Sequence, residues 1–130
     1  MKLYYDKEID YLEIFFKKDV NYGEDLTDDV MVFKSELSDA VVGYAFEDAE
    51  KNAPAFAVFN LSIKLAILLK IARTKNGLTQ EESAKKIGSL TLRHYQRLES
   101  GEGNTTLELF AEIMKAYPNE DFTVIFKNAA

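Results

Sequence analysis

Residues 78–101 read LTQEESAKKIGSLTLRHYQRLESG and decide how the second half of the chain folds. Thr79 is followed three residues later by a glutamate, a capping box that starts a helix. Gly88 ends that helix because glycine adopts a left-handed conformation without a steric penalty. Thr91 can cap a second helix, which Gly101 ends in turn. The stretch therefore predicts two short helices joined by a tight turn.

Both predicted helices have an apolar face and a polar face. Ala84 and Ile87 share one side of the first helix, and Tyr95 and Leu98 share one side of the second. The outward face of the second helix carries a row of long hydrogen-bond donors, namely Arg93, His94, Gln96 and Arg97. A helix that lies in the DNA major groove needs such a row to reach base edges and phosphates.

The segments LTQEESAKKIG, RLESG and NTTLELFAEIMKA resemble the helix-turn-helix domains of phage Cro and lambda-type repressors. The resemblance covers roughly Leu61–Pro118. It implies a domain of about five helices that binds operator DNA as a dimer, with Thr91–Ser100 as the recognition helix. It also implies that Gln80 lies where the family contacts the DNA backbone.

The chain departs from this family at two places. The turn around Ser89–Leu90 is one residue longer than the common pattern, and Ser83 stands where the family usually has a leucine. We expect Tyr95, which is larger than the usual isoleucine, to fill the volume that Ser83 leaves. Substituting leucine for Ser83 should then overpack the core and destabilise the fold.

Charge is distributed unevenly between the two halves of the chain. Residues 1–60 carry 6 Lys and Arg against 14 Asp and Glu, a net charge of −8, whereas residues 61–130 carry 10 against 8, a net charge of +2. The second half is therefore compatible with modest affinity for nucleic acid. The acidic first half should repel DNA and favour a basic protein partner.

Composition limits the remaining functional classes. The 130 residues include no cysteine, which rules out disulfides and thiolate zinc sites and suits a reducing cytoplasm. We expect no signal peptide and no membrane span, because the longest apolar run is far too short. His94 is the only histidine, and no phosphate-binding loop is present, so we expect no enzyme activity, no metal and no cofactor.

Alternating apolar residues predict four strands in the first half, at residues 3–5, 11–16, 30–33 and 41–46. Turns are expected between them, at residues 6–8, 21–24 and 35–39. The expected fold of this half is a four-stranded antiparallel meander. Its segments YYDKEIDYLEIFF and VVGYAFEDAEK resemble a family known only as domain of unknown function 2283, which implies a fold and no chemistry.

Two features of the first half allow a functional interpretation that we do not favour. The acidic residues at 24, 25, 28 and 29 lack the ligand order of a calcium loop, so a solvated turn is the better interpretation. The aromatic residues could form a stacking platform for single-stranded nucleic acid, but such platforms come with basic grooves. We interpret these rings as core and interface residues.

The division of the chain is expected at Lys51–Pro54, which gives an acidic β-domain at 1–52 and a helix-turn-helix domain at 53–130. The first helix of the second domain should span Leu61–Asn76. A second capping box, Thr105 with Glu108, should start the helix that Pro118 ends. Residues 122–126 read FTVIF and predict a final strand, which must pair with the N-terminal sheet or with a partner's strand.

The sequence therefore predicts an α+β protein that regulates transcription by binding double-stranded operator DNA as a homodimer in the cytoplasm. The expected DNA-binding residues are Thr79, Gln80, Thr91, Arg93, His94, Gln96 and Arg97. A repressor-like domain joined to a small acidic domain is also similar to the antitoxins of toxin–antitoxin pairs. The alternatives are an interaction module that has lost DNA binding and a ligand-sensing repressor, for which the sequence shows no pocket residues.

Overall fold

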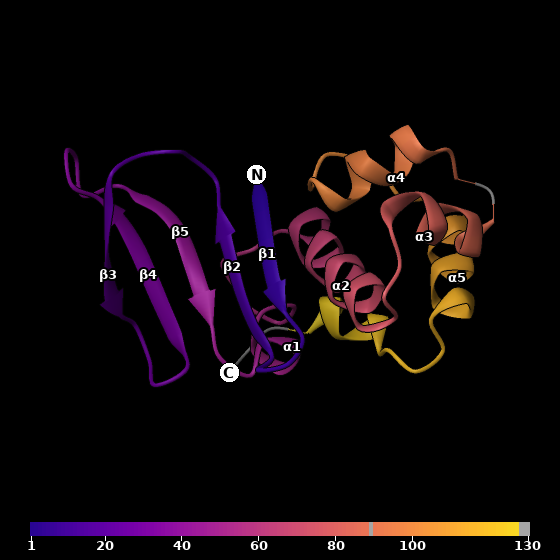
Figure 1. Ribbon diagram of the computed structural model, residues 1–130, viewed down its shortest axis with the longest axis horizontal. Helices are drawn as coiled ribbons and strands as arrows, with labels where there is room; N and C mark the ends of the chain where they lie inside the picture. The colour runs from indigo at the N-terminus through magenta and orange to yellow at the C-terminus, as the bar shows by residue number, and fades with distance from the viewer. Residues whose placement is uncertain (89, 128–130) are drawn as a thin grey trace. The chain divides into compact units, whose positions relative to one another are not determined.

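The computed structural model describes residues 1–88 and 90–127 (Figure 1). The fold is α+β, as expected, and the chain divides into two compact units, Met1–Ala53 and Pro54–Ala130. Among the described residues, no helix is both long enough and apolar enough to cross a lipid bilayer.

The first unit is an antiparallel sheet of five strands in the order β1-β2-β5-β4-β3 (Figure 1). The strands are β1 (Lys2–Asp6), β2 (Tyr11–Phe15), β3 (Asn21–Asp25), β4 (Val30–Ser35) and β5 (Val41–Phe46). A four-residue helix, α1 (Ala49–Asn52), follows the last strand.

The expected four-stranded meander is wrong in two respects. Residues 21–24, expected as a turn, belong to the edge strand β3, and β5 lies between β2 and β4. The segment NYGED of β3 is half-buried or exposed throughout, so it lacks the apolar alternation that identifies a strand in sequence. By contrast, β5 is buried at five of its six residues, which suits a central position in the sheet.

Register places the apolar side chains of the central strands on one face of the sheet. Leu12 and Ile14 of β2 lie opposite Phe46 and Tyr44 of β5, and all four are buried. On the other face, the rings of Phe15 and Phe33 stack with their centroids 5.0 Å apart. This close approach requires Gly43 between them, because a Cβ there would lie 2.8 Å from the Phe15 ring and 2.4 Å from the Ile14 carbonyl oxygen.

The described part of the second unit contains four α-helices and one 3-10 helix. They are α2 (Leu61–Lys75), α3 (Gln80–Ile87), α4 (Leu92–Glu99), α5 (Leu107–Ala116) and the 3-10 helix η1 (Phe122–Phe126). Helix α5 starts one residue later than expected. Thr106, and not Thr105, is its N-cap and accepts a hydrogen bond from the Leu109 amide, so the predicted capping box of Thr105 and Glu108 is wrong.

One hydrophobic core joins all of these helices. Four residues of α2 that were expected to face it, Leu65, Leu68, Leu69 and Ala72, are buried there. The inward faces predicted for α3 and α4 are confirmed, since Ala84, Ile87, Tyr95 and Leu98 belong to the same core. The helices that present polar residues outward are therefore held on a common apolar base.

The predicted C-terminal strand is wrong, because residues Phe122–Phe126 form the 3-10 helix η1. Phe122 and Ile125 are buried in the core of the second unit, and a spacing of three residues matches the 3-10 period. The side chain of Asp121 accepts a hydrogen bond from the Thr123 amide and starts this turn. The segment thus satisfies part of its backbone hydrogen bonding locally and does not need to join a sheet.

Candidate nucleic-acid interface

Helix α3 begins at the predicted capping box. The Thr79 hydroxyl accepts a hydrogen bond from the Glu82 amide at 3.1 Å, and the Thr79 amide donates to the Glu82 carboxylate at 2.9 Å. The hydrogen bond from the Thr79 amide, together with the Thr79 side chain, holds the pKa of the Glu82 carboxyl below its usual value. Gly88 ends the helix with φ at 111°, a conformation that favours glycine. Ser89, in the turn that follows, lies outside the described residues.

Helix α4 presents the row of donors that the sequence predicts. Thr91 is its N-cap and accepts a hydrogen bond from the His94 amide at 3.1 Å. Arg93, Gln96 and Arg97 are exposed. Within residues 1–88 and 90–127, neither Arg93 nor Arg97 has an ion pair, and Glu99 of the same helix is not their partner. Both guanidinium groups are free to meet an anionic partner.

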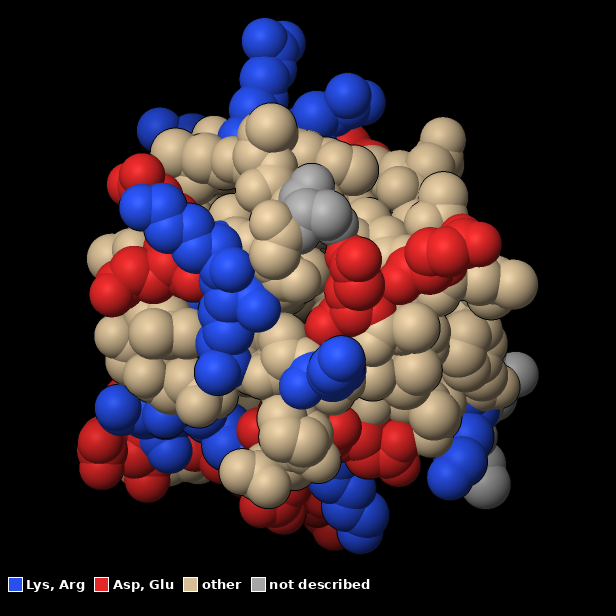
Figure 2. Space-filling view, turned by 90° about the vertical axis from the view of Figure 1, so that its right-hand side faces the viewer, with Lys and Arg blue, Asp and Glu red and all other residues tan. Residues whose placement is uncertain are grey.

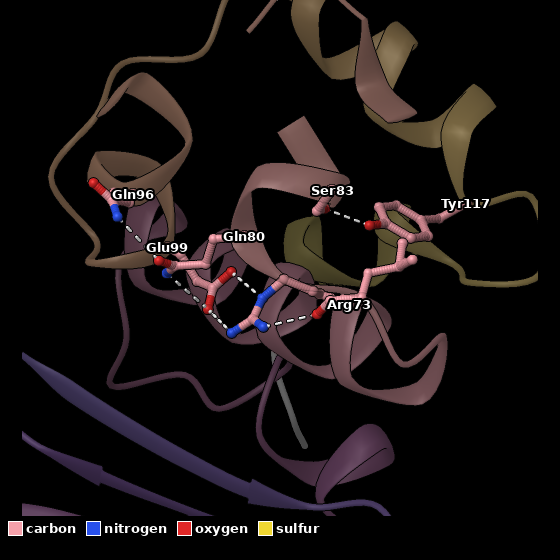
Figure 3. Close-up of polar contacts among 7 residues, drawn as sticks. Arg73, Gln80, Ser83, Gln96, Glu99 and Tyr117 are labelled. Atoms are coloured by element: carbon pink, nitrogen blue, oxygen red, sulfur yellow. Dashed lines mark hydrogen bonds and ion pairs between the residues drawn. The ribbon is translucent and has the colours of Figure 1, made fainter. Parts of the chain in front are cut away.

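Glu99 instead points into the protein and pairs with Arg73 of α2 (Figure 3). The Arg73 guanidinium donates to the two carboxylate oxygens of Glu99 at 2.9 and 2.7 Å, and to the Leu78 carbonyl at 3.0 Å. The two side chains are 13% and 5% exposed. The hydrogen bonds to Glu99 raise the pKa of Arg73, so its guanidinium stays charged. This bidentate contact fixes α4 to α2 and to the residues before α3.

Gln80 and Gln96 extend this network toward the surface (Figure 3). The side-chain amide nitrogen of Gln80 donates to the Glu99 carboxylate at 3.5 Å. The side-chain amide nitrogen of Gln96 donates to the side-chain carbonyl of Gln80 at 3.3 Å. The structure therefore brings together two of the predicted site residues, one at the start of α3 and one in the middle of α4. The orientation of each amide is fixed by its neighbour.

Ser83 is fully buried, and its hydroxyl is hydrogen-bonded to the hydroxyl of Tyr117 at the end of α5 (Figure 3). Tyr95 is buried as well, but its hydroxyl has no hydrogen-bond partner among the described residues. Burial raises the pKa of both tyrosines above the usual value, so both phenols are neutral. The serine that departs from the family pattern thus links α3 to α5.

His94 is placed differently from its neighbours on α4. It is half-buried and borders a cavity of about 240 Å3 together with Leu90, Thr106, Glu108 and Glu112. Its ring therefore lies beside the first turns of α5, whereas Arg93 and Arg97 are exposed. A DNA contact by His94 stays a prediction.

Figure 2 shows the face of the second unit on which α3, α4 and α5 lie. Lysine and arginine side chains project from its top edge, where Figure 1 places α4. Acidic side chains gather lower on this face and toward its sides. Positive charge is thus present at the helix that carries the row of exposed donors, and further Lys and Arg side chains lie lower on the same face, among the acidic ones.

A family model of the helix-turn-helix matches residues 69–123. This stretch runs from the second half of α2 to the start of η1. In this stretch the chain is similar to a helix-turn-helix. No curated protein and no solved structure gives a significant match to the chain. The likeness of the first unit to domain of unknown function 2283 stays a prediction.

Sequence reasoning missed Arg73 and Glu99, which hold the interface together. One signal was available, because Glu99 lies four residues after Tyr95 and therefore on the buried face of its helix. A carboxylate on a buried face requires a cationic or hydrogen-bonding partner. The identity of that partner, 26 residues earlier in the chain, could not be read from local spacing.

Proposed function

We propose that the protein is a sequence-specific DNA-binding regulator of transcription in which α4 enters the major groove of operator DNA. The observation that carries this proposal is the pair of exposed arginines on α4, one turn apart and without ion pairs in the described part of the chain. A helix-turn-helix uses such exposed side chains for base and phosphate contacts. The buried Arg73–Glu99 contact supports it, because base readout needs a recognition helix with a fixed orientation.

Each predicted contact residue except His94 has a proposed role. Arg93 contacts a base, since arginine pairs bidentately with guanine, and Arg97 reaches a base or a phosphate. The side-chain amide of Gln96 keeps its oxygen and one N–H free, and these two groups together recognise adenine. Thr79, Thr91 and Gln80 set the register on the backbone. The Thr91 oxygen accepts a helix amide, which leaves its hydroxyl hydrogen for phosphate.

A homodimer is part of the proposal, because a helix-turn-helix regulator reads two half-sites with two copies. The second unit has an apolar groove of about 250 Å3 between the first turns of α2 and α5 and the end of η1. Leu61, Leu107 and Phe126 border the groove and are 51%, 85% and 62% exposed. A second copy of the chain would cover these side chains.

The acidic first unit favours an additional role as an antitoxin-like repressor in the cytoplasm. Exposed carboxylates line the edge strand β3 and the turn after it. Glu24 and Asp25 lie at the end of the strand, and Asp28 and Asp29 follow after two further residues. Such a surface would attract a basic protein, for example a toxin encoded beside it. The alternative function uses this surface alone, with the helix-turn-helix as a scaffold that does not bind DNA.

The deciding experiment is fluorescence anisotropy with duplex DNA from the upstream region of the gene, across a salt series. Wild type is compared with the Arg93→Ala/Arg97→Ala variant and with Lys115→Ala/Lys127→Ala, which removes the same charge from exposed positions outside α3 and α4. Arg93→Ala alone should cost ~1–3 kcal/mol and relax preference at one base pair. The double variant should lose selective binding, and the control should keep it.

The salt dependence separates the two functions. Selective binding by wild type that weakens steeply with salt supports the regulator, because released counterions drive the phosphate contacts. Feeble binding that is equal in wild type and in the α4 variant contradicts it. A basic protein that co-purifies in that second case would favour the interaction module.

A further inference from the structure

The first unit contains a surface cavity of about 400 Å3 at one end of its sheet. The cavity is bordered by the start of β1, the end of β2 and the connection from β2 to β3. All of its lining residues fall within positions 1–21, so it is formed by this unit alone. Its volume lies in the range of sites that bind small organic molecules.

The charge around this cavity is opposite to that of the unit. Residues 1–53 carry 6 lysines against 14 Asp and Glu, yet three of these lysines, Lys2, Lys17 and Lys18, border the cavity. All three are exposed, and Lys2 and Lys18 have no ion pair among the described residues. A local excess of cations in a strongly acidic unit indicates a preference for an anion at this position.

The one carboxylate on the lining offsets only one of the three lysine charges. Asp19 accepts hydrogen bonds from the Ser35 hydroxyl at 2.8 Å and from the Val20 amide at 3.1 Å. Its distance to the Lys17 ammonium is 4.0 Å, the outer limit of an ion pair. Asp19 is therefore engaged in holding the β2–β3 connection in place.

Two aromatic rings form the apolar part of the lining. Phe15 lies directly opposite Lys2 in the β1–β2 register and is held in place by its stack on Phe33. Phe16, the next residue, is 41% exposed and is fixed by a hydrogen bond from its amide to the Val42 carbonyl. Three lysines thus border the same cavity as two aromatic rings whose backbone is held by the sheet.

We propose that this cavity binds a small organic anion that carries a phosphate or carboxylate group on a flat apolar body. The lysines contact the anionic group, and Phe15 and Phe16 contact the ring. This site is independent of the helix-turn-helix and of the DNA-binding function proposed above.

An NMR titration of the full chain tests the proposal by following the backbone amide signals of residues 15–21. The ligands are adenosine 5′-monophosphate, 2-naphthoate, adenosine and inorganic phosphate. The first two join an anion to a ring and differ in the anionic group, and the last two supply the ring and the anion separately. The variant Lys2→Gln/Lys18→Gln is compared with Lys7→Gln/Lys51→Gln, which removes two exposed lysines that do not border the cavity.

We expect at least one of the two ring-bearing anions to give saturable shifts centred on residues 15–21. Binding should be about tenfold weaker in Lys2→Gln/Lys18→Gln and unchanged in the control variant. Adenosine and phosphate alone should each bind more weakly than the joined molecule. Comparison of the monophosphate with the naphthoate then shows which anionic group the lysines prefer.

Three results would overturn the proposal. The first is the absence of saturable shifts with both ring-bearing anions. The second is equal binding by wild type and the Lys2→Gln/Lys18→Gln variant. The third, from a parallel titration with duplex DNA, is a shift of residues 15–21 by DNA only, which would assign the lysines to nucleic acid. None of these results bears on the arginines of α4, so a failure here leaves the regulator proposal standing.

Discussion

Ser83 illustrates how a single residue sets the packing of the helix-turn-helix core. A leucine at this position would contribute apolar area, whereas the serine contributes a hydrogen bond to Tyr117. The sequence predicts that the larger Tyr95 compensates for the smaller Ser83. That Tyr95 fills the volume left by Ser83 stays a prediction. The hydrogen bond to Tyr117, 34 residues away, follows only from the tertiary structure.

We expect Ser83→Leu to destabilise the protein by about 1–3 kcal/mol, because the larger side chain must displace well-packed neighbours. The substitution also leaves the buried Tyr117 hydroxyl without the Ser83 hydroxyl. Urea unfolding followed by circular dichroism measures the effect, and Ser83→Ala serves as the control that removes the hydroxyl without adding volume. A Ser83→Leu protein more stable than Ser83→Ala would contradict the packing argument.

At the scale of single elements, the boundaries of α3 and α4 follow from their caps. Thr79, Gly88 and Thr91 act over three or four residues, so local sequence predicts them reliably. The segment Phe122–Phe126 shows the limit of local reasoning. Its residues favour a strand by composition, but the burial of Phe122 and Ile125 in the helical core stabilises a 3-10 turn.

The cap of α3 also predicts a dependence of stability on pH. The Glu82 pKa is lowered in the folded protein, so its contribution is present at neutral pH, above the unfolded pKa of about 4.3. That contribution is lost as the pH falls through the folded pKa. Glutamine at position 82 does not titrate, so Glu82→Gln should lack this loss.

The measurement is the unfolding free energy of wild type and Glu82→Gln from neutral to acidic pH. The stability difference between them should shrink as the pH falls below the unfolded pKa. The variant Glu81→Gln, whose carboxylate takes no part in the cap, should show no comparable convergence. A difference that stays constant with pH would argue against a capping role for the Glu82 carboxylate.

At the scale of the whole molecule, the two units differ in both fold and charge. The first is an acidic sheet with a cation-lined cavity, and the second is a helical unit whose exposed arginines lie on α4. The proposed function places DNA binding and dimerisation in the second unit. The groove beside Leu107 is the surface through which the two copies would meet.

We therefore expect Leu107→Asp to weaken self-association and DNA binding together. Leu107 is 85% exposed at the first position of α5, where an aspartate is favourable, so the fold itself should be unaffected. Leu37→Asp, at a residue of the first unit that is 86% exposed, is the matched control. Sedimentation analysis across a concentration series measures the effect, and a wild type that is monomeric throughout would contradict the dimer.

Sequence by itself determined the α+β class, the positions of α2, α3 and α4, their inward faces and the exposed arginines. These features follow from local caps and helical periodicity, which act over a few residues. Tertiary structure decided the place of β3, the central position of β5, the conformation of residues 122–126, the Arg73–Glu99 pair and the cavity beside Lys2. The first four depend on residues far apart in the chain, whose proximity no local pattern encodes, and the cavity depends on the β1–β2 register that brings Lys2 opposite Phe15.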